Sequence, residues 1–311
     1  MLFRRRRPGR LLHGIEKLTR YALNRAGFTS RVVGVGPARL HVYDGPGKGA
    51  LPPVVLLHGL GASASTFAAL VGLLRPHVKR IVVPELPGHG FSDHPGHAVT
   101  PEVIETSVIA TIDELLDEPA LVVGNSLGGA LALHVAVTRP EKVKGLVLLS
   151  PAGARLPDAE WDDVRRAFQI ASRREALALI RRIYHQPKWF VALFAHEFPE
   201  LMSRPAVTEL LATATNEHAV TPDELAALAM PVLLVWGRSE RLLPSAALTY
   251  FREHLPAHAV VEEPYGLGHV PQVDDPARMA ARILSFARSC EASRPPVTAE
   301  RAGTHASRPV S

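Results

Sequence analysis

Apolar positions in this chain follow two patterns that alternate along most of its length. Short apolar runs bounded by glycine or proline predict buried strands, and longer stretches with an apolar residue every three or four positions predict helices. The runs lie near 53–58, 79–84, 120–125 and 144–149, and the helical stretches near 64–75, 101–117 and 127–138. Strands that alternate with helices predict a parallel sheet with helices on its faces.

Two regions depart from this alternation. Arg31–Val35 and Arg39–Tyr43 are predicted to form an antiparallel hairpin ahead of the parallel strands. Between Pro151 and Met230 the pattern is helical, without strands, before strand and helix resume through Arg288. The predicted units are a basic leader at 1–30, an α/β core at 31–153 and 230–288, a helical cap at 154–229, and a disordered tail at 289–311 that is rich in Ser, Pro, Ala and Thr.

The positive charge of the chain is confined to its leader. The first 31 residues hold nine Lys and Arg against one acidic residue, Glu16, whereas the whole chain has a net charge of only +5. The rest of the chain is therefore net acidic, which argues against a nucleic-acid partner. The segment after Arg4–Arg7 is interrupted by polar residues and lacks the apolar core of a signal peptide.

The leader also has an amphipathic pattern. Leu11, Ile15, Leu18 and Ala22 recur at helical spacing, which predicts a basic amphipathic helix. Two interpretations stay open: the helix docks on the domain, or residues 1–28 make peripheral contact with an anionic membrane. No apolar stretch of the length of an ordinary transmembrane helix, about 18 residues, occurs in the sequence. The single cysteine, Cys290, excludes an intramolecular disulfide and is compatible with a cytoplasmic protein.

The candidate chemistry centres on Gly124-Asn125-Ser126-Leu127-Gly128, which follows a predicted strand and opens a predicted helix. A serine on such a sharp turn is held in a strained conformation, and the flanking glycines relieve the crowding around it. The helix that begins at Leu127 directs free N–H groups toward the same point, where they favour an oxyanion. This spacing predicts a nucleophilic serine, whereas the simpler interpretation is a helix N-cap.

Two later segments supply the groups that a nucleophilic serine needs. A strand at 232–236 leads to Glu240, and a glycine-rich loop carries His269. A base must accept the serine proton, and a carboxylate must fix the tautomer of that base. Asp93 and Asp158 are alternative acids, although solvated loop carboxylates are the better interpretation of both.

The order serine, acid, histidine resembles that of the α/β-hydrolase superfamily, over about Arg31–Arg288. The resemblance rests on His58-Gly59, on the serine motif, on Pro87-Gly88-His89-Gly90-Phe91-Ser92-Asp93 and on Gly268-His269. It implies a mostly parallel central sheet flanked by helices, with a helical cap after the sixth strand. It also implies Ser126 as nucleophile, His269 as base, and the backbone N–H groups of Leu60 and Leu127 as the oxyanion hole. Many members have Trp-Gly-x-x-Asp where this chain has Trp236-Gly237-Arg238-Ser239-Glu240, so the acid is expected to be a glutamate.

Other histidines have structural explanations. The resemblance implies that His58 packs behind the oxyanion loop and is not catalytic. His89, His94 and His97 lie close together in sequence, but their spacing matches no strong zinc motif. We therefore expect neither a metal site nor a cofactor.

The predicted cap is rich in aromatic residues and is expected to line an apolar substrate pocket. The candidates for this pocket are Trp161, Phe168, Trp189, Phe190 and Phe194.

The favoured function is a serine esterase or lipase-like enzyme that cleaves a small-molecule carboxylic ester of a hydrophobic acyl group. One alternative is a carbon–carbon bond hydrolase of ring-fission products, whose members share Gly-Asn-Ser-x-Gly-Gly but typically have tryptophan at the position of Val270. A catalytically silent ligand-binding protein on the same scaffold is an alternative of another class.

Overall fold

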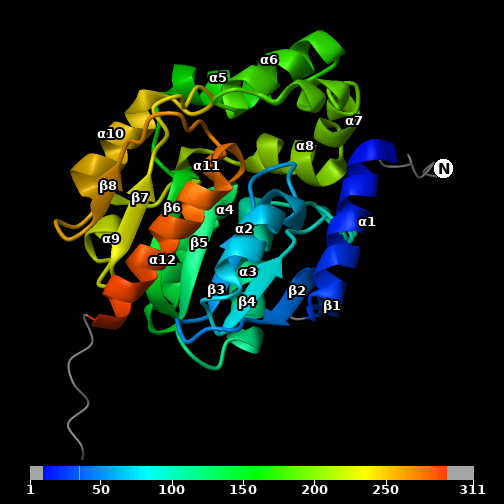
Figure 1. Ribbon diagram of the computed structural model, residues 1–311. Coiled ribbons are helices and arrows are strands. Elements are labelled where there is room, and N and C mark those ends of the chain that lie inside the picture. The colour runs from blue at the N-terminus through cyan, green and yellow to red at the C-terminus, as the bar shows by residue number, and fades with distance from the viewer. Residues whose placement is uncertain (1–9, 35, 293–311) are drawn as a thin grey trace, which may run out of the picture.

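The computed structural model describes residues 10–34 and 36–292, and in these residues eight strands form a single sheet (Figure 1). The spatial order is β1-β2-β4-β3-β5-β6-β7-β8. Their bounds are β1 Thr29–Val33, β2 Leu40–Pro46, β3 Val54–Leu57, β4 Arg80–Pro84, β5 Ala120–Ser126, β6 Val143–Pro151, β7 Val232–Val235 and β8 Val260–Glu262. Strands β3 to β8 are parallel, and β2 is antiparallel to β1 and β4. The predicted hairpin and parallel sheet are confirmed.

Helices cover both faces of the sheet, as Figure 1 shows. They are α2 Ala68–Leu74, α3 Pro101–Leu115, α4 Leu127–Thr138, α10 Ser245–His254, α11 Pro271–Asp274 and α12 Pro276–Ala292, with short 3₁₀ turns η1 Ala64–Phe67 and η2 Pro140–Lys142. Alternate residues of the central strands enter two separate apolar clusters. Val122 packs on the α3 and α4 side, whereas Val123 packs on the α2 and α12 side. This period of two explains why these strands are apolar at every position.

A helical insertion joins β6 to β7. It consists of α5 Asp158–Ala167, α6 Arg173–Ile183, η3 Trp189–Leu193, α7 Phe198–Met202, α8 Pro205–Thr213, η4 Asn216–His218 and α9 Pro222–Ala226. In Figure 1, α5 to α8 lie above the carboxyl ends of the parallel strands. Since β6 is the sixth strand, the expected place of the insertion is confirmed.

The leader forms α1, Arg10–Arg25, which stands at the edge of the molecule with its first turn beside α7 (Figure 1). It docks on the domain, as one interpretation of the leader held. The docked side of the helix is mixed: Glu16, Thr19 and Leu23 are buried, whereas Leu18 is exposed.

The predicted boundaries differ from the structure at the two ends of the core. Helix α12 continues past Arg288 to Ala292, so the first part of the predicted tail is helical. The rest of the tail, Val35 of the predicted hairpin and the basic run Arg4–Arg7 lie outside the described residues. Within those residues, no helix combines the length and the apolar character needed to cross a bilayer.

Candidate active site

Ser126 lies at the junction of β5 and α4, in a backbone conformation that few non-glycine residues adopt. Its φ is +55° and its ψ is −122°. The two glycines of the motif allow strand and helix to meet this closely. A Cβ atom added to Gly124 would lie 2.0 Å from the carbonyl oxygen of Gly128, and one added to Gly128 would lie 2.0 Å from the carbonyl oxygen of Leu57. The crowding that requires glycine therefore comes from the backbone of neighbouring segments.

Glu240 and His269 form a buried pair beside this turn. His269 Nδ1 lies 2.8 Å from Glu240 Oε2, and both side chains are almost fully buried. The other carboxylate oxygen, Oε1, accepts hydrogen bonds from the backbone N–H groups of Leu242 and Leu243, at 2.8 and 3.0 Å. The longer glutamate side chain thus reaches the imidazole while its second oxygen is held by the following turn.

The charge state of Glu240 follows from these contacts. Burial by itself would raise the pKa of the carboxyl, but His269 and the two backbone donors outweigh it and hold the pKa of Glu240 below its usual value. The carboxylate therefore stays ionised at neutral pH. In that state it orients an Nδ1–H group on His269 and leaves Nε2 as the atom that exchanges protons.

Asn125 ties the histidine loop to the end of β5. Its side-chain N–H groups donate to the carbonyl oxygens of His269 and Leu149, at 2.8 and 2.9 Å. Its oxygen accepts a hydrogen bond of 3.0 Å from Gln272 Nε2. No role was predicted for Asn125. Its position directly before the candidate nucleophile nevertheless indicates a residue that lies within the site.

The same loop is bound to the helical insertion. The backbone N–H of His269 donates to the carbonyl oxygen of Ile183 at the end of α6 (2.8 Å). Asp274 accepts from the backbone N–H of Gly268 at 2.7 Å and from that of His185 at 3.2 Å. The candidate base is therefore fixed from the sheet side and from the insertion side.

The loop after β3 brings the candidate oxyanion donors to Ser126. Gly59 approaches so closely that an added Cβ would lie 3.2 Å from Ser126 Cβ. Among the described residues, no hydrogen-bond partner is recorded for the Leu60 backbone N–H, and that of Leu127 belongs to the first, unpaired turn of α4. Both N–H groups thus remain available to a ligand beside the serine.

His58 and His89 support this loop. His58 Nε2 accepts from the backbone N–H of Leu86 at 3.1 Å, and His89 Nε2 accepts from that of Gly61 at 3.1 Å. Burial lowers the pKa of both rings, that of His89 to about 3. Both are therefore neutral at pH 7 and act as hydrogen-bond acceptors in the positions predicted to be structural.

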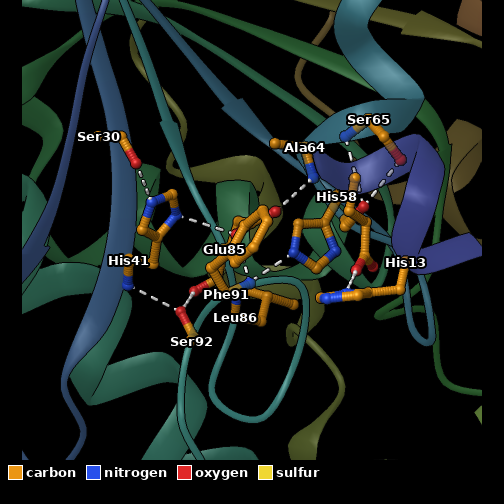
Figure 2. A network of polar contacts seen from close by, with 12 residues as sticks. His13, Ser30, His41, His58, Ala64, Ser65, Glu85, Leu86, Phe91 and Ser92 are labelled. Carbon is orange, nitrogen blue, oxygen red and sulfur yellow. Dashed lines mark hydrogen bonds and ion pairs between the residues drawn. The ribbon is translucent and has the colours of Figure 1, made fainter. Parts of the chain in front are cut away.

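Glu85 extends the same support, as the network in Figure 2 shows. Its Oε1 accepts from the backbone N–H of Ala64 at 3.1 Å, and its Oε2 accepts from that of Phe91 at 2.7 Å. His41 Nδ1 lies 3.0 Å from the same Oε2 atom. One buried carboxylate, directly after β4, therefore joins β2, the start of η1 and the loop after β4, a role that was not predicted from the sequence.

Two cavities meet at Ser126. The first, of about 140 Å³, runs between α4 and the insertion and is mostly apolar; the second, of about 170 Å³, lies between the loop after β3, the insertion and α1 and also contains His269. Of the predicted pocket residues, Trp161 lines the first cavity and Phe168 lines both. The serine thus faces an apolar space on either side.

The other predicted pocket residues lie elsewhere, which corrects that prediction. Trp189 and Phe190 are 79% and 43% exposed, and neither they nor the half-buried Phe194 line the two cavities. The 3₁₀ turn η3 turns the first two side chains toward solvent, an orientation that an aromatic-rich pattern does not specify.

The histidines of the loop after β4 have separate partners. His94 pairs with Glu209 on α8 at 2.9 Å, and His97 contacts the carbonyl oxygen of Pro37 at 3.1 Å, while His89 binds Gly61. Within residues 10–34 and 36–292, no group of three or more metal-ligating side chains is assembled. Asp93 is exposed, and Asp158 begins α5.

The fold and the strand–turn–helix serine are those of an α/β-hydrolase, and comparison with known proteins gives the same class. The alpha/beta hydrolase family matches residues 54–282. Over 252 residues the chain is 32% identical to the pimeloyl-[acyl-carrier protein] methyl ester esterase of Xanthomonas campestris pv. campestris (strain B100), which covers 76% of this chain and 94% of the relative. The chain belongs to the alpha/beta hydrolase family, and the prediction of a hydrolase of this family is confirmed.

Two further similarities bear on fold and chemistry. The chain is 28% identical over 275 residues to the 2-hydroxymuconate semialdehyde hydrolase of Pseudomonas sp. (strain CF600), covering 82% of this chain and 92% of that one. The structure of the present chain resembles that of a bacterial membrane phospholipase A, with a TM-score of 0.77 and 22% identity. The match covers 90% of this chain and 91% of that one. The second similarity supports the fold alone.

Proposed function

We propose that this chain is a serine hydrolase that cleaves carboxylic esters of a hydrophobic acyl group through an acyl-enzyme. The observation that carries the proposal is the buried contact of 2.8 Å between His269 Nδ1 and Glu240 Oε2, with His269 lining the same cavity as Ser126. A histidine oriented in this way is the base that a serine hydroxyl needs, because the hydroxyl is a weak nucleophile at neutral pH.

In the proposed mechanism, Ser126 Oγ attacks the ester carbonyl carbon and its proton passes to His269 Nε2. The backbone N–H groups of Leu60 and Leu127 stabilise the oxyanion of the tetrahedral intermediate. The intermediate collapses when the alkoxide leaves with the proton from His269, so that the acyl group remains on Ser126. A water molecule then gives its proton to His269 and attacks the acyl-enzyme, which releases the carboxylic acid and restores the serine. No cofactor takes part.

The apolar lining of the first cavity favours the binding of an acyl group of substantial length. Leu131, Val164 and Leu210 belong to its lining, which the helical insertion completes as a cap. Burying an apolar chain there contributes about 0.8 kcal/mol per methylene group. Turnover of p-nitrophenyl esters should therefore rise from acetate toward medium-chain acyl groups, whereas a decline from acetate onward would contradict the proposed acyl site.

A carbon–carbon bond hydrolase is the second candidate, favoured by the similarity to 2-hydroxymuconate semialdehyde hydrolase. The loss of dienol absorbance with 2-hydroxymuconate semialdehyde measures this activity directly. Turnover of that compound at a higher kcat/KM than any p-nitrophenyl ester would replace the ester proposal. A silent scaffold would turn over neither substrate and would form no fluorophosphonate adduct on Ser126.

We also propose that the enzyme is cytoplasmic and that its residues 1–28 contact an anionic membrane. The lone, buried Cys290 and the basic leader support this setting. Fractionation of cells that express the full chain tests it, and recovery outside the cytoplasmic and membrane fractions would contradict it.

A further inference from the structure

Helix α1 docks on the protein through a mixed polar and apolar side and leaves a second, apolar stripe exposed to solvent. Glu16, Thr19 and Leu23 are buried against the domain. The exposed apolar side chains of the helix are Leu11, Ile15, Leu18 and Tyr21, with exposed fractions of 48%, 38%, 68% and 60%. Ordinary surface helices bury such a stripe, so this arrangement leaves an apolar surface without a partner in the described structure.

Specific polar contacts fix this orientation. The buried carboxylate of Glu197, in the insertion, accepts hydrogen bonds of 2.8 Å from the backbone N–H groups of Leu11 and Leu12. Further along the helix, the Arg20 guanidinium lies 4.8 Å from the centre of the Phe91 ring. A rotation that buried Leu18 would break both contacts. These contacts of the docked side therefore hold the apolar stripe outward.

A second group of exposed apolar side chains shortly precedes, in the chain, the insertion residue that binds the first turn of α1. Trp189, Phe190 and Leu193 are 79%, 43% and 54% exposed. They belong to η3, which ends four residues before Glu197, the residue that binds the start of α1. In Figure 1, the first turn of α1 lies beside α7, the helix that follows η3 in the chain. We call these three residues, with the four of α1, the apolar face.

The charge around the apolar face favours an anionic partner. Lys17 and Arg25 are exposed on α1, and the Arg25 guanidinium lies 5.9 Å from the Tyr21 ring within the apolar face itself. Arg4–Arg7 directly precede the helix in the sequence, outside the described residues. An apolar stripe with a tyrosine, flanked by lysine and arginine, is typical of a helix that lies in the headgroup region of an anionic bilayer, and exposed tryptophan, such as Trp189 of η3, is enriched at the same depth.

The apolar face is continuous with the candidate active site. Ile15 belongs to the apolar face and, with Leu12, lines the cavity that contains Ser126 and His269. We propose that the apolar face binds an anionic membrane and that lipophilic esters pass from the bilayer to Ser126 between α1 and the insertion. This inference deepens the membrane contact proposed above; the passage of ester rests on the proposed serine hydrolase, whereas binding to the membrane needs no catalysis.

The test is co-sedimentation of the full chain with vesicles of phosphatidylglycerol and phosphatidylcholine, or of phosphatidylcholine alone. We expect the anionic vesicles to bind at least about tenfold more protein, and added salt to weaken the binding. The double variant Leu18→Glu/Tyr21→Glu and the single variant Trp189→Glu should each reduce partitioning to anionic vesicles by about tenfold or more. Val260→Glu is the matched control: Val260 is 43% exposed on β8, at the other end of the sheet, and its substitution should leave binding unchanged.

Two further measurements separate this inference from the proposed function. Ser126→Ala should bind vesicles as the wild type does, and all three surface variants should keep kcat/KM for p-nitrophenyl butyrate, which shows that they fold. Equal partitioning of the wild type, the α1 double variant and Trp189→Glu would overturn the inference. A dimer that Leu18→Glu/Tyr21→Glu dissociates, without binding of the wild type to anionic vesicles, would overturn it in favour of a second copy as the partner.

Discussion

The side chain of Asn125 donates a hydrogen bond of 2.8 Å to the backbone carbonyl oxygen of His269, so the residue before the candidate nucleophile holds the loop of the candidate base. Asn125→Ala removes this bond and leaves buried polar groups of His269 and Gln272 without their partner. We expect a loss of about 1–3 kcal/mol in the free energy of unfolding. We also expect a larger loss in kcat than in substrate affinity, because the base and not the pocket is displaced.

Urea unfolding and steady-state kinetics on p-nitrophenyl butyrate measure the two effects of Asn125→Ala. Unchanged kcat in a variant that is destabilised would restrict Asn125 to a structural role. Asn216→Ala is a control for the stability effect alone: Asn216 bonds the backbone of Leu156 and not the histidine loop, but it lines the apolar cavity, so only its unfolding is compared.

Ser126→Ala should abolish turnover because it removes the nucleophile. The fold should stay intact because the substitution removes no contact of the apolar core. The expected fall in kcat is about 10⁴-fold or more. Intact mass after fluorophosphonate treatment should show one adduct on the wild type and none on the variant. A variant that keeps more than a tenth of the wild-type rate would exclude Ser126 as nucleophile.

Glu240→Gln should lower kcat by about 10²–10⁴-fold, because an amide presents the wrong group to His269 Nδ1–H. Glu240→Asp should lower it less, since the charge stays and only the reach to Nδ1 becomes shorter. Asp93→Asn and Asp158→Asn are the controls and should remain within a few-fold of wild type. A fast Glu240→Gln together with a dead aspartate variant would move the acid to that aspartate.

Ser126, Glu240 and His269 could be proposed from the sequence because each follows an apolar strand or lies in a glycine-rich loop, where the local pattern marks the turn. The role of Glu85 could not be predicted in the same way. Its partners Ala64 and His41 are distant in sequence, and no periodicity records which buried carboxylate meets which N–H group. The outward orientation of Trp189 was missed for a related reason, since composition does not distinguish a pocket wall from an exposed turn.

The free energy of unfolding should decrease at acidic pH because His89 is held neutral in the folded protein. Burial and the neighbouring His58 lower the pKa of folded His89 to about 3, while the unfolded chain takes up the same proton near pH 6.5. The free energy of unfolding should therefore be unaffected by His89 above pH 6.5 and decrease from pH 6.5 toward pH 3. At pH 5 the expected cost is about 2 kcal/mol.

The variant His89→Gln isolates this effect, because glutamine can still accept from the Gly61 N–H but does not titrate. Urea unfolding between pH 7.5 and pH 4.5 should show a shallower decline for this variant than for the wild type. The exposed His77→Gln is the control and should keep the wild-type decline. Parallel curves for wild type and His89→Gln would contradict the assignment.

Val164→Trp should shift acyl-chain preference toward short esters. Val164 is buried on α5 and lines the apolar cavity next to Ser126, so the larger side chain fills space that a medium-length acyl chain would occupy. We expect kcat/KM for p-nitrophenyl octanoate to fall by about tenfold or more while that for acetate stays within a few-fold. Trp189→Ala should leave this profile unchanged, and an equal loss on every ester would argue against an acyl site at Val164.

The bond from the His269 backbone N–H to the Ile183 carbonyl has a consequence for how the insertion can move. Arg241 strengthens the same attachment by donating to the carbonyl oxygens of Arg181 and His185. The insertion is thus joined to the loop of the candidate base at the end of α6, and at another point Glu197 accepts hydrogen bonds from the backbone N–H groups of Leu11 and Leu12 in α1. The leader is therefore a second tether of the insertion. We expect a chain that begins after Arg25 to lose this tether and to hold its products less tightly.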